Sequence, residues 1–203
     1  ILQAYGAQVV LTPAAEKMPS AVKKAIELQS QIANSFIPQQ FENPANPSIH
    51  RVTTAPEILQ QTEGKLDVFV ATAGTGGTIT GTGEALKEHL PNLQVIVVEP
   101  KGSPVLSGGE PGPHKLVGTS PGFVPAILNT DVYDEIVQVA DEHAIQTTRD
   151  LARLEGILVG PSAGAAVWTA IQKARVLGPG KRVLCIAPDN GERYLSMEGL
   201  FEE

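Results

Sequence analysis

The sequence has 203 residues, of which 42% are hydrophobic and 18% are charged, and its formal net charge is -7. This acidic balance argues against a nucleic-acid partner, because phosphate backbones are bound by clustered Lys and Arg. No apolar stretch approaches the roughly 20 residues that cross a bilayer, and no signal peptide is recognisable, so we expect a cytoplasmic protein with a small-molecule ligand. The single cysteine, Cys185, lies in an apolar run, where a buried small hydrophobe is favoured over a reactive thiol.

The first part of the chain, up to residue 47, is predicted to hold a helix and a short strand. Residues 1–6 have the pattern of a last helical turn that stops at a glycine, and this leads us to expect further chain upstream. Residues 9–11 are predicted as a short strand. Helical spacing of apolar residues follows over 20–34, with Ser20 as the candidate N-cap. The two prolines in 42–47 predict an irregular crossing between two domains.

Beyond this crossing, strands and helices are predicted to alternate. Helices are expected at 55–61, 78–90, 141–155 and 161–174, with Asp141 as the cap of the third. Strands are expected at 66–71, 95–98, 136–139 and 182–187, with a long Gly- and Pro-rich loop over 101–125. The strands are continuous apolar runs, which is typical of strands buried on both faces. The sequence therefore predicts an α/β fold with an open, mostly parallel sheet covered by helices on both faces.

The strongest motif is the glycine-rich segment Gly74-Thr75-Gly76-Gly77-Thr78. It follows a predicted strand and opens a predicted helix. Glycines let several backbone N–H groups turn toward one anion, and the helix N-terminus adds partial positive charge. The two threonine hydroxyls can donate as well. We interpret the segment as a cradle for a small phosphate group.

Two better-known phosphate motifs fit this segment less well. A P-loop would need lysine where Thr82 stands, directly after Gly81, so nucleoside triphosphate binding is not expected. A dinucleotide fingerprint would need a third glycine where Ile79 stands, although Glu99 ends the next strand where a ribose-binding acid could lie. An NAD-dependent oxidoreductase therefore stays open as a lesser alternative.

A second turn, Gly160-Pro161-Ser162-Ala163-Gly164, follows a short apolar stretch and opens a helix of small residues. Such residues let another group, or a flat ring, approach the backbone closely. Ser162 would present its hydroxyl at the carboxyl edge of the sheet, where open α/β sheets bind ligands. From the residues alone, an ordinary helix N-cap is slightly favoured over a ligand-binding role for Ser162. The four histidines of the chain lack metal-ligand spacing, and no metal site is predicted.

Taken together, several segments resemble cysteine synthases, the O-acetylserine sulfhydrylases among fold-type-II (tryptophan synthase β-like) pyridoxal-phosphate enzymes. The resembling segments are residues 39–47, 74–81, 111–115, 160–166 and 191–196. The resemblance implies that residues 1–46 are the C-terminal part of a small domain. It implies that 47–203 are most of a large cofactor-binding domain, and that the protein is a homodimer.

The resemblance also implies residue roles. The segment Gly74 to Thr78 would bind the phosphate of pyridoxal 5'-phosphate, and Ser162 would hydrogen-bond its pyridine nitrogen. Gln40 would contact the substrate carboxylate, and Gly118 would lie near the mouth of the site and help to close it. The Schiff-base lysine of the family is expected upstream of Ile1, so no catalytic residue is assigned within this chain, which alone is expected to be inactive.

The implied reaction is the β-replacement that makes L-cysteine from O-acetyl-L-serine and sulfide by way of bound aminoacrylate, a step of amino-acid biosynthesis. A cystathionine β-synthase or a serine/threonine dehydratase is an alternative within the same fold. A catalytically inactive fragment or binding module is an alternative of another class. Serine acetyltransferase is an implied partner, whereas no nucleic acid and no membrane is expected.

Overall fold

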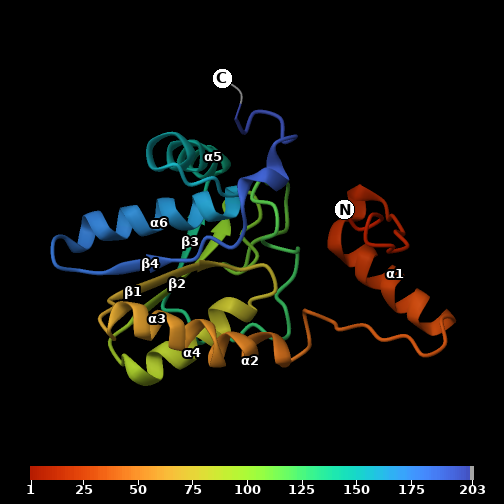
Figure 1. Ribbon diagram of the computed structural model, residues 1–203, viewed down its shortest axis with the longest axis horizontal. Coiled ribbons are helices and arrows are strands. Elements are labelled where there is room, and N and C mark those ends of the chain that lie inside the picture. Colours follow the sequence, from red (N-terminus) through yellow and green to blue (C-terminus); the bar gives the residue numbers. More distant parts are fainter. Residues whose placement is uncertain (202–203) are drawn as a thin grey trace. The chain divides into compact units, whose positions relative to one another are not determined.

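The computed structural model describes residues 1–201 (Figure 1). The chain divides into two compact units, Ile1–Gln39 and Gln40–Glu203. We describe each unit by itself. The boundary between the units lies seven residues before the domain division expected after Asn46. That domain division stays a prediction.

The first unit contains one long helix and no buried residue. Residues 2–6 form a turn and not a helix, although the predicted glycine stop has the expected geometry: Gly6 has φ +80°, its N–H donates to the Gln3 carbonyl, and the next N–H donates to the Leu2 carbonyl, as in a Schellman motif. The predicted strand at 9–11 does not form. Helix α1 spans Lys17–Gln31 and follows a short 3-10 turn, Ala14–Glu16.

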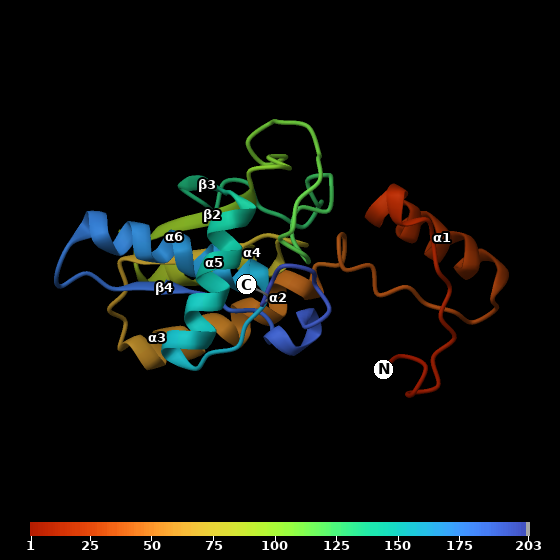
Figure 2. The same ribbon diagram turned by 90° about the horizontal axis from the view of Figure 1, so that it is seen from above.

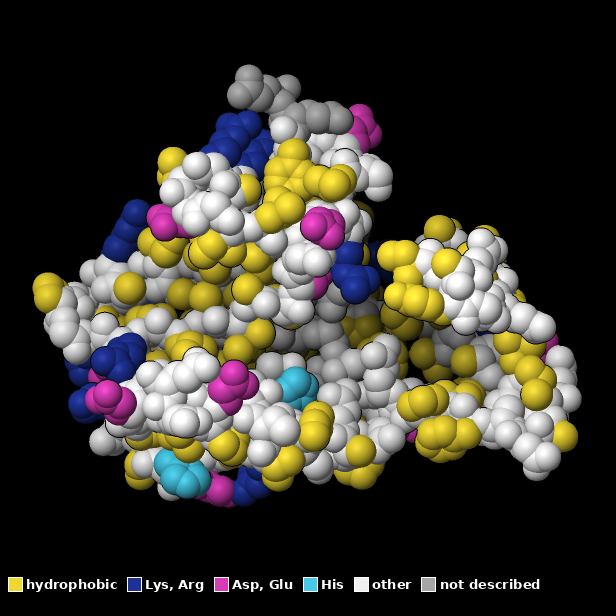
Figure 3. Space-filling model, viewed as in Figure 1, with side chains coloured by type: hydrophobic (Ala, Val, Ile, Leu, Met, Phe, Trp, Pro, Cys, Tyr) yellow, Lys and Arg dark blue, Asp and Glu magenta, His cyan; other side chains and the backbone are white. Residues whose placement is uncertain are grey.

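The start of α1 differs from the prediction, and the surface of this unit is rich in exposed hydrophobic side chains. Ser20 does not cap α1, because the helix begins three residues earlier and the Ser20 hydroxyl donates back to the Lys17 carbonyl at 3.0 Å. Hydrophobic side chains are exposed over the unit (Figure 3), and Leu11 and Phe36 are 87% and 78% exposed.

The second unit is built on a parallel sheet. Its strands are β1 (Val68–Thr72), β2 (Gln94–Pro100), β3 (Glu135–Val139) and β4 (Val183–Cys185), in the order β3-β2-β1-β4. All three pairings are parallel. The central strands β1 and β2 are buried almost throughout, as their continuous apolar runs predicted.

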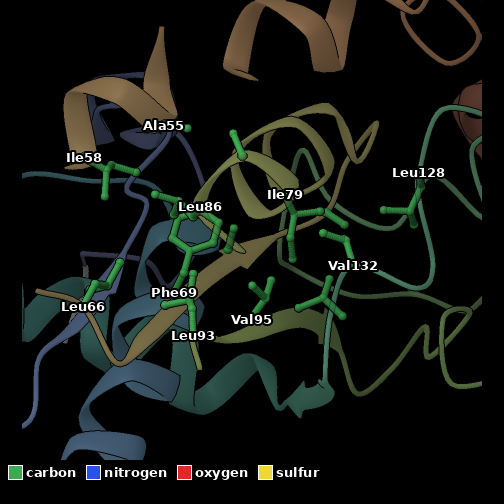
Figure 4. Close-up of a cluster of buried hydrophobic side chains, with 14 residues drawn as sticks. Ala55, Ile58, Leu66, Phe69, Ile79, Leu86, Leu93, Val95, Leu128 and Val132 are labelled. Atoms are coloured by element: carbon green, nitrogen blue, oxygen red, sulfur yellow. The ribbon is translucent and has the colours of Figure 1, made fainter. Parts of the chain in front are cut away.

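Helices cover both faces of this sheet (Figures 1 and 2). One face carries α2 (Ala45–Val52), α3 (Thr54–Thr62) and α4 (Gly77–His89). Phe69 and Val95 of the sheet pack there against Ile79 and Leu86 of α4, all fully buried (Figure 4). Burying side chains of this size contributes roughly 1.5–3 kcal/mol each, so the position of α4 on the sheet is firmly fixed.

The opposite face carries α5 (Asp141–Asp150), which continues as a π-helical turn (Leu151–Glu155), and α6 (Pro161–Leu177). The small residues of α6 allow tight packing. A β-carbon at Gly164 would lie 2.2 Å from the Ala144 carbonyl oxygen of α5. The predicted α/β fold with a parallel sheet covered on both faces is confirmed.

Two local predictions were wrong. Residues 42–47 are not wholly irregular, because α2 begins at Ala45 and includes Pro47. A proline is tolerated there, since the first four N–H groups of a helix have no intrahelical acceptor. The Asn43 side chain accepts the Ala45 N–H at 3.0 Å and supports the start. Asp141 is the first residue of α5 rather than its cap, and its carboxylate accepts the Lys115 N–H instead.

Cys185 lies on β4 and is partly buried. Burial raises the pKa of its thiol to about 11, so the thiol is protonated at neutral pH. This favours its interpretation as a packing residue. Among residues 1–201, no helix combines the length and the apolar character needed to cross a bilayer.

Candidate functional site

The glycine-rich segment lies at the carboxyl edge of the sheet. It connects the end of β1 at Thr72 to the start of α4 at Gly77. The α6 N-terminus follows Val159, which forms an isolated bridge with Asn190, just beyond the neighbouring strand β4. Because the strands are parallel, both helix N-termini lie at the edge where open α/β sheets bind ligands.

Three glycines of the segment have no space for a side chain unless a neighbouring group moves. A β-carbon at Gly74 would lie 2.4 Å from the Gly118 carbonyl oxygen, and one at Gly77 would lie 1.9 Å from Asn46 Oδ1. Gly76 has φ +85°, and its β-carbon would lie 2.7 Å from the Leu128 side chain. The sequence thus uses glycine where the backbone of the segment is packed closely from several sides.

The inner backbone of the segment is suited to an anion. Within residues 1–201, no protein group accepts the N–H groups of Thr75, Gly76 or Thr78. Gly76 directly precedes α4, so these N–H groups lie at the N-terminus of the helix, which is the positive end of its dipole. Backbone donors grouped at a helix N-terminus fit a phosphate group. We call residues 74–78 the cradle.

Helix α2 supports the cradle with two side chains one helical turn apart. Asn46 Nδ2 donates to the Gln40 carbonyl at 2.8 Å and to Thr75 Oγ1 at 3.0 Å. His50 Nε2 lies 3.2 Å from Thr78 Oγ1. Sequence reasoning assigned no role to either residue. Their spacing of four would have placed them on one face if α2 had been predicted from residue 45.

The environment of His50 predicts a pH effect on stability. Burial lowers the pKa of its imidazole below the ordinary value. The unfolded chain therefore binds this proton more readily, and stability is lost as the pH falls through the unfolded pKa of about 6.5. We expect His50→Gln, whose amide can still reach Thr78, to lose less free energy of unfolding in urea between about pH 7.5 and about pH 5.5 than the unchanged protein. Parallel pH curves for the two proteins would contradict this assignment.

Ser162 is the second residue of α6 and is only 2% exposed. The turn before it is covered by the C-terminal segment. A β-carbon at Gly160 would lie 2.4 Å from the Tyr194 ring and 2.5 Å from Asp189 Oδ1. The Tyr194 hydroxyl donates to Asp189, and burial together with this carboxylate raises the pKa of Tyr194 to about 12. The structure places Ser162 at the same sheet edge as the cradle.

Gly118 and Gln40 are both linked to the cradle. Gly118 has φ +86°, its carbonyl packs on Gly74, and two residues later the Ser120 N–H donates to the Ala73 carbonyl at 3.0 Å. The backbone carbonyl of Gln40 accepts a hydrogen bond from Asn46 Nδ2, and Gln40 is exposed. The expected roles of Gly118 and Gln40 toward a substrate stay predictions.

The structure argues against the dinucleotide alternative. Glu99 is 2% exposed, and its carboxylate accepts the N–H groups of Leu106 and Ser107 and the Ser107 hydroxyl. Its oxygens are thus engaged by the adjoining loop, not presented to a ribose. Ile79, at the place of the missing third glycine, is fully buried in the core.

Comparison with known proteins agrees with this geometry. The family model described as "Pyridoxal-phosphate dependent enzyme" matches residues 1–189. The chain belongs to this family. It is 65% identical over 201 residues to a probable cysteine synthase of Bacillus subtilis, and 56% identical over 197 residues to a cysteine synthase of Staphylococcus aureus. These alignments cover 98% and 97% of this chain but 65% and 63% of the relatives, so the chain spans slightly less than two thirds of their length.

Solved structures confirm the fold type. The O-acetylserine dependent cystathionine beta-synthase of Helicobacter pylori superposes with a TM-score of 0.94 at 44% identity. The superposition covers 99% of this chain and 65% of that structure. The predicted resemblance to cysteine synthases and the fold-type-II class are both confirmed. Pyridoxal phosphate is the cofactor of this family, and the cradle, with its grouped backbone donors and excluded β-carbons, fits the phosphate of that cofactor.

Proposed function

We propose that the intact protein is a pyridoxal-phosphate-dependent cysteine synthase, which makes L-cysteine from O-acetyl-L-serine and sulfide by β-replacement. The observation that carries this proposal is the 65% identity to a probable cysteine synthase across 98% of the chain. The geometry of the cradle at the carboxyl edge of the sheet supports the proposal, because this loop would hold the cofactor phosphate.

The residues of this chain would hold and orient the cofactor. The N–H groups of Thr75, Gly76 and Thr78 would bind the phosphate, and the Ser162 hydroxyl would meet the pyridine nitrogen. Bound pyridoxal phosphate supplies an electron sink, which eases loss of the substrate's α-proton and departure of its β-substituent. A neutral hydroxyl at Ser162 does not hold the pyridine nitrogen protonated as a carboxylate would. This suits the moderate electron withdrawal that β-elimination needs.

The loops around the cradle would bind and enclose the substrate. We propose that Gln40 contacts the substrate carboxylate and that Gly118 lies at the mouth of the site, where closure would exclude water. The Schiff-base lysine is proposed to come from the part of the protein outside these 203 residues. We also propose a cytoplasmic homodimer with serine acetyltransferase as a partner, on the strength of the family resemblance.

The identity of the sulfur-bearing nucleophile is the decisive test. The full-length protein would be loaded with pyridoxal phosphate and given O-acetylserine together with either sulfide or homocysteine. We expect acetate release and cysteine formation with sulfide. Preference for homocysteine with cystathionine as the product would instead favour the second candidate, an activity like that named for the Helicobacter pylori structure. Absence of acetate release with either nucleophile would overturn both.

A further inference from the structure

The hydroxyl of Thr75 has both of its acceptor positions occupied. Asn46 Nδ2 donates to Thr75 Oγ1 at 3.0 Å, and the Gly77 N–H donates to the same oxygen at 3.3 Å. A hydroxyl accepts two hydrogen bonds and donates one. Its single proton is therefore left for a third partner, and within residues 1–201 the protein provides no acceptor for it.

The orientation of the Asn46 amide is fixed by the backbone. Its Nδ2 faces the carbonyl oxygen of Gln40 at 2.8 Å, and a carbonyl can only accept. The NH₂ group must therefore lie on this side, and its second proton is directed to Thr75. Asn46 cannot be an acceptor for the Thr75 hydroxyl in this arrangement. The opposite end of the amide, Oδ1, packs over Gly77, where the missing β-carbon leaves room for it.

We propose that Asn46 is a positioning residue of the cradle. By donating to Thr75 Oγ1 it makes the Thr75 hydroxyl an obligate donor toward the anion, so that this proton joins the backbone N–H groups on the cofactor phosphate. The inference rests on the proposed cofactor site and deepens it. Asn46 touches no phosphate oxygen itself; it acts through Thr75.

The test compares two probes that differ only in the phosphate. Dissociation constants of pyridoxal phosphate and of pyridoxal would be measured by fluorescence with the full-length apoprotein and with its Asn46→Asp variant. An aspartate at this position only accepts, so it would capture the Thr75 proton. We expect the variant to bind pyridoxal phosphate about 10- to 100-fold more weakly, which is the effect of losing a hydrogen bond to a charged group. Binding of pyridoxal should change less than threefold.

Further variants separate positioning from folding. Asn43→Asp introduces the same charge in the same segment, and its carboxylate can still accept the Ala45 N–H. We expect this control to keep the preference for the phosphorylated probe. Thr75→Ser should retain that preference as well, and Thr75→Val should lose it. In the Thr75→Val background, Asn46→Asp should cost clearly less affinity for pyridoxal phosphate than it does alone.

The outcomes distinguish this inference from the proposed function. Equal weakening of both probes by Asn46→Asp would show a purely structural role and overturn the inference alone. The inference alone would also be overturned if Asn46→Asp lowered the affinity for pyridoxal phosphate as much in the Thr75→Val background as it does alone. If the unchanged apoprotein bound pyridoxal as tightly as pyridoxal phosphate, the cradle would not be a phosphate site. The proposed cofactor site and the inference would then both fall.

Discussion

Replacing Gly81 with alanine is expected to lower the free energy of unfolding by about 2 kcal/mol and to weaken cofactor binding at least tenfold. A β-carbon there would lie 1.9 Å from the Pro47 carbonyl oxygen and 3.1 Å from the Arg51 N atom, both in the backbone of α2. Backbone atoms cannot rotate aside, so α2 must move away from α4. Alanine gains about 1 kcal/mol over glycine in helix propensity, which offsets only part of this strain.

Cofactor binding is expected to weaken because two side chains of α2 contact the cradle. Asn46 and His50 contact the hydroxyls of Thr75 and Thr78, so a displaced α2 withdraws its support from both threonines of the cradle. Urea unfolding and titration with pyridoxal phosphate, on the full-length protein, measure the two effects.

Gly83→Ala is the matched control, since it makes the same change in the same helix. The atoms nearest to its β-carbon would all be side-chain methyl groups, with Val132 Cγ2 at 2.9 Å and Val95 Cγ1 at 3.4 Å. We expect a loss of stability below about 1 kcal/mol and unchanged cofactor affinity. If Gly81→Ala behaved like this control, the close approach of α2 to α4 would not be needed to hold the cradle.

The sheet and the cradle could be predicted from the sequence because their signals are local. Continuous apolar runs indicated strands β1 to β4, and the glycine pattern after β1 indicated a phosphate loop at a helix N-terminus. Each signal lies within about ten residues and follows from side-chain period or backbone freedom. For the same reason the glycine stop at Gly6 was predicted correctly, although it ends a turn and not a helix. The strand expected at 9–11 has no neighbour to pair with among the described residues of its unit.

The support of the cradle could not be predicted, because it depends on contacts between distant segments. Asn46 and Thr75 are 29 residues apart, and the prolines at 44 and 47 argued against the helix that brings them together. A proline in a first helical turn costs little, since its missing N–H would have no intrahelical acceptor. Gly77 was assigned to the phosphate loop, and Gly81 was given no role in packing. The structure shows that the absence of a side chain at both positions also lets α2 pack closely against α4.

Removing the carboxylate of Glu99 by the change Glu99→Ala is expected to cost about 3 kcal/mol of unfolding free energy. Glu99 ends β2, is 2% exposed, and accepts the N–H groups of Leu106 and Ser107 together with the Ser107 hydroxyl. Alanine would leave these donors without their acceptor in a partly buried loop. Amide hydrogen exchange at Leu106 and Ser107 should accelerate more than exchange in β1.

The effect should extend to the cradle, because the same loop is connected to it. Ser103 lies between Glu99 and the donor residues, and its hydroxyl is 3.0 Å from that of Ser120, whose N–H donates to Ala73 beside Gly74. Glu99→Gln is a milder variant that serves as the control. Its amide oxygen can still accept a hydrogen bond, whereas its NH₂ group faces an N–H group and cannot accept from it. We expect its loss of stability to be intermediate. If Glu99→Ala were as stable as the unchanged protein, water would be serving these donors equally well, and Glu99 would not order the loop.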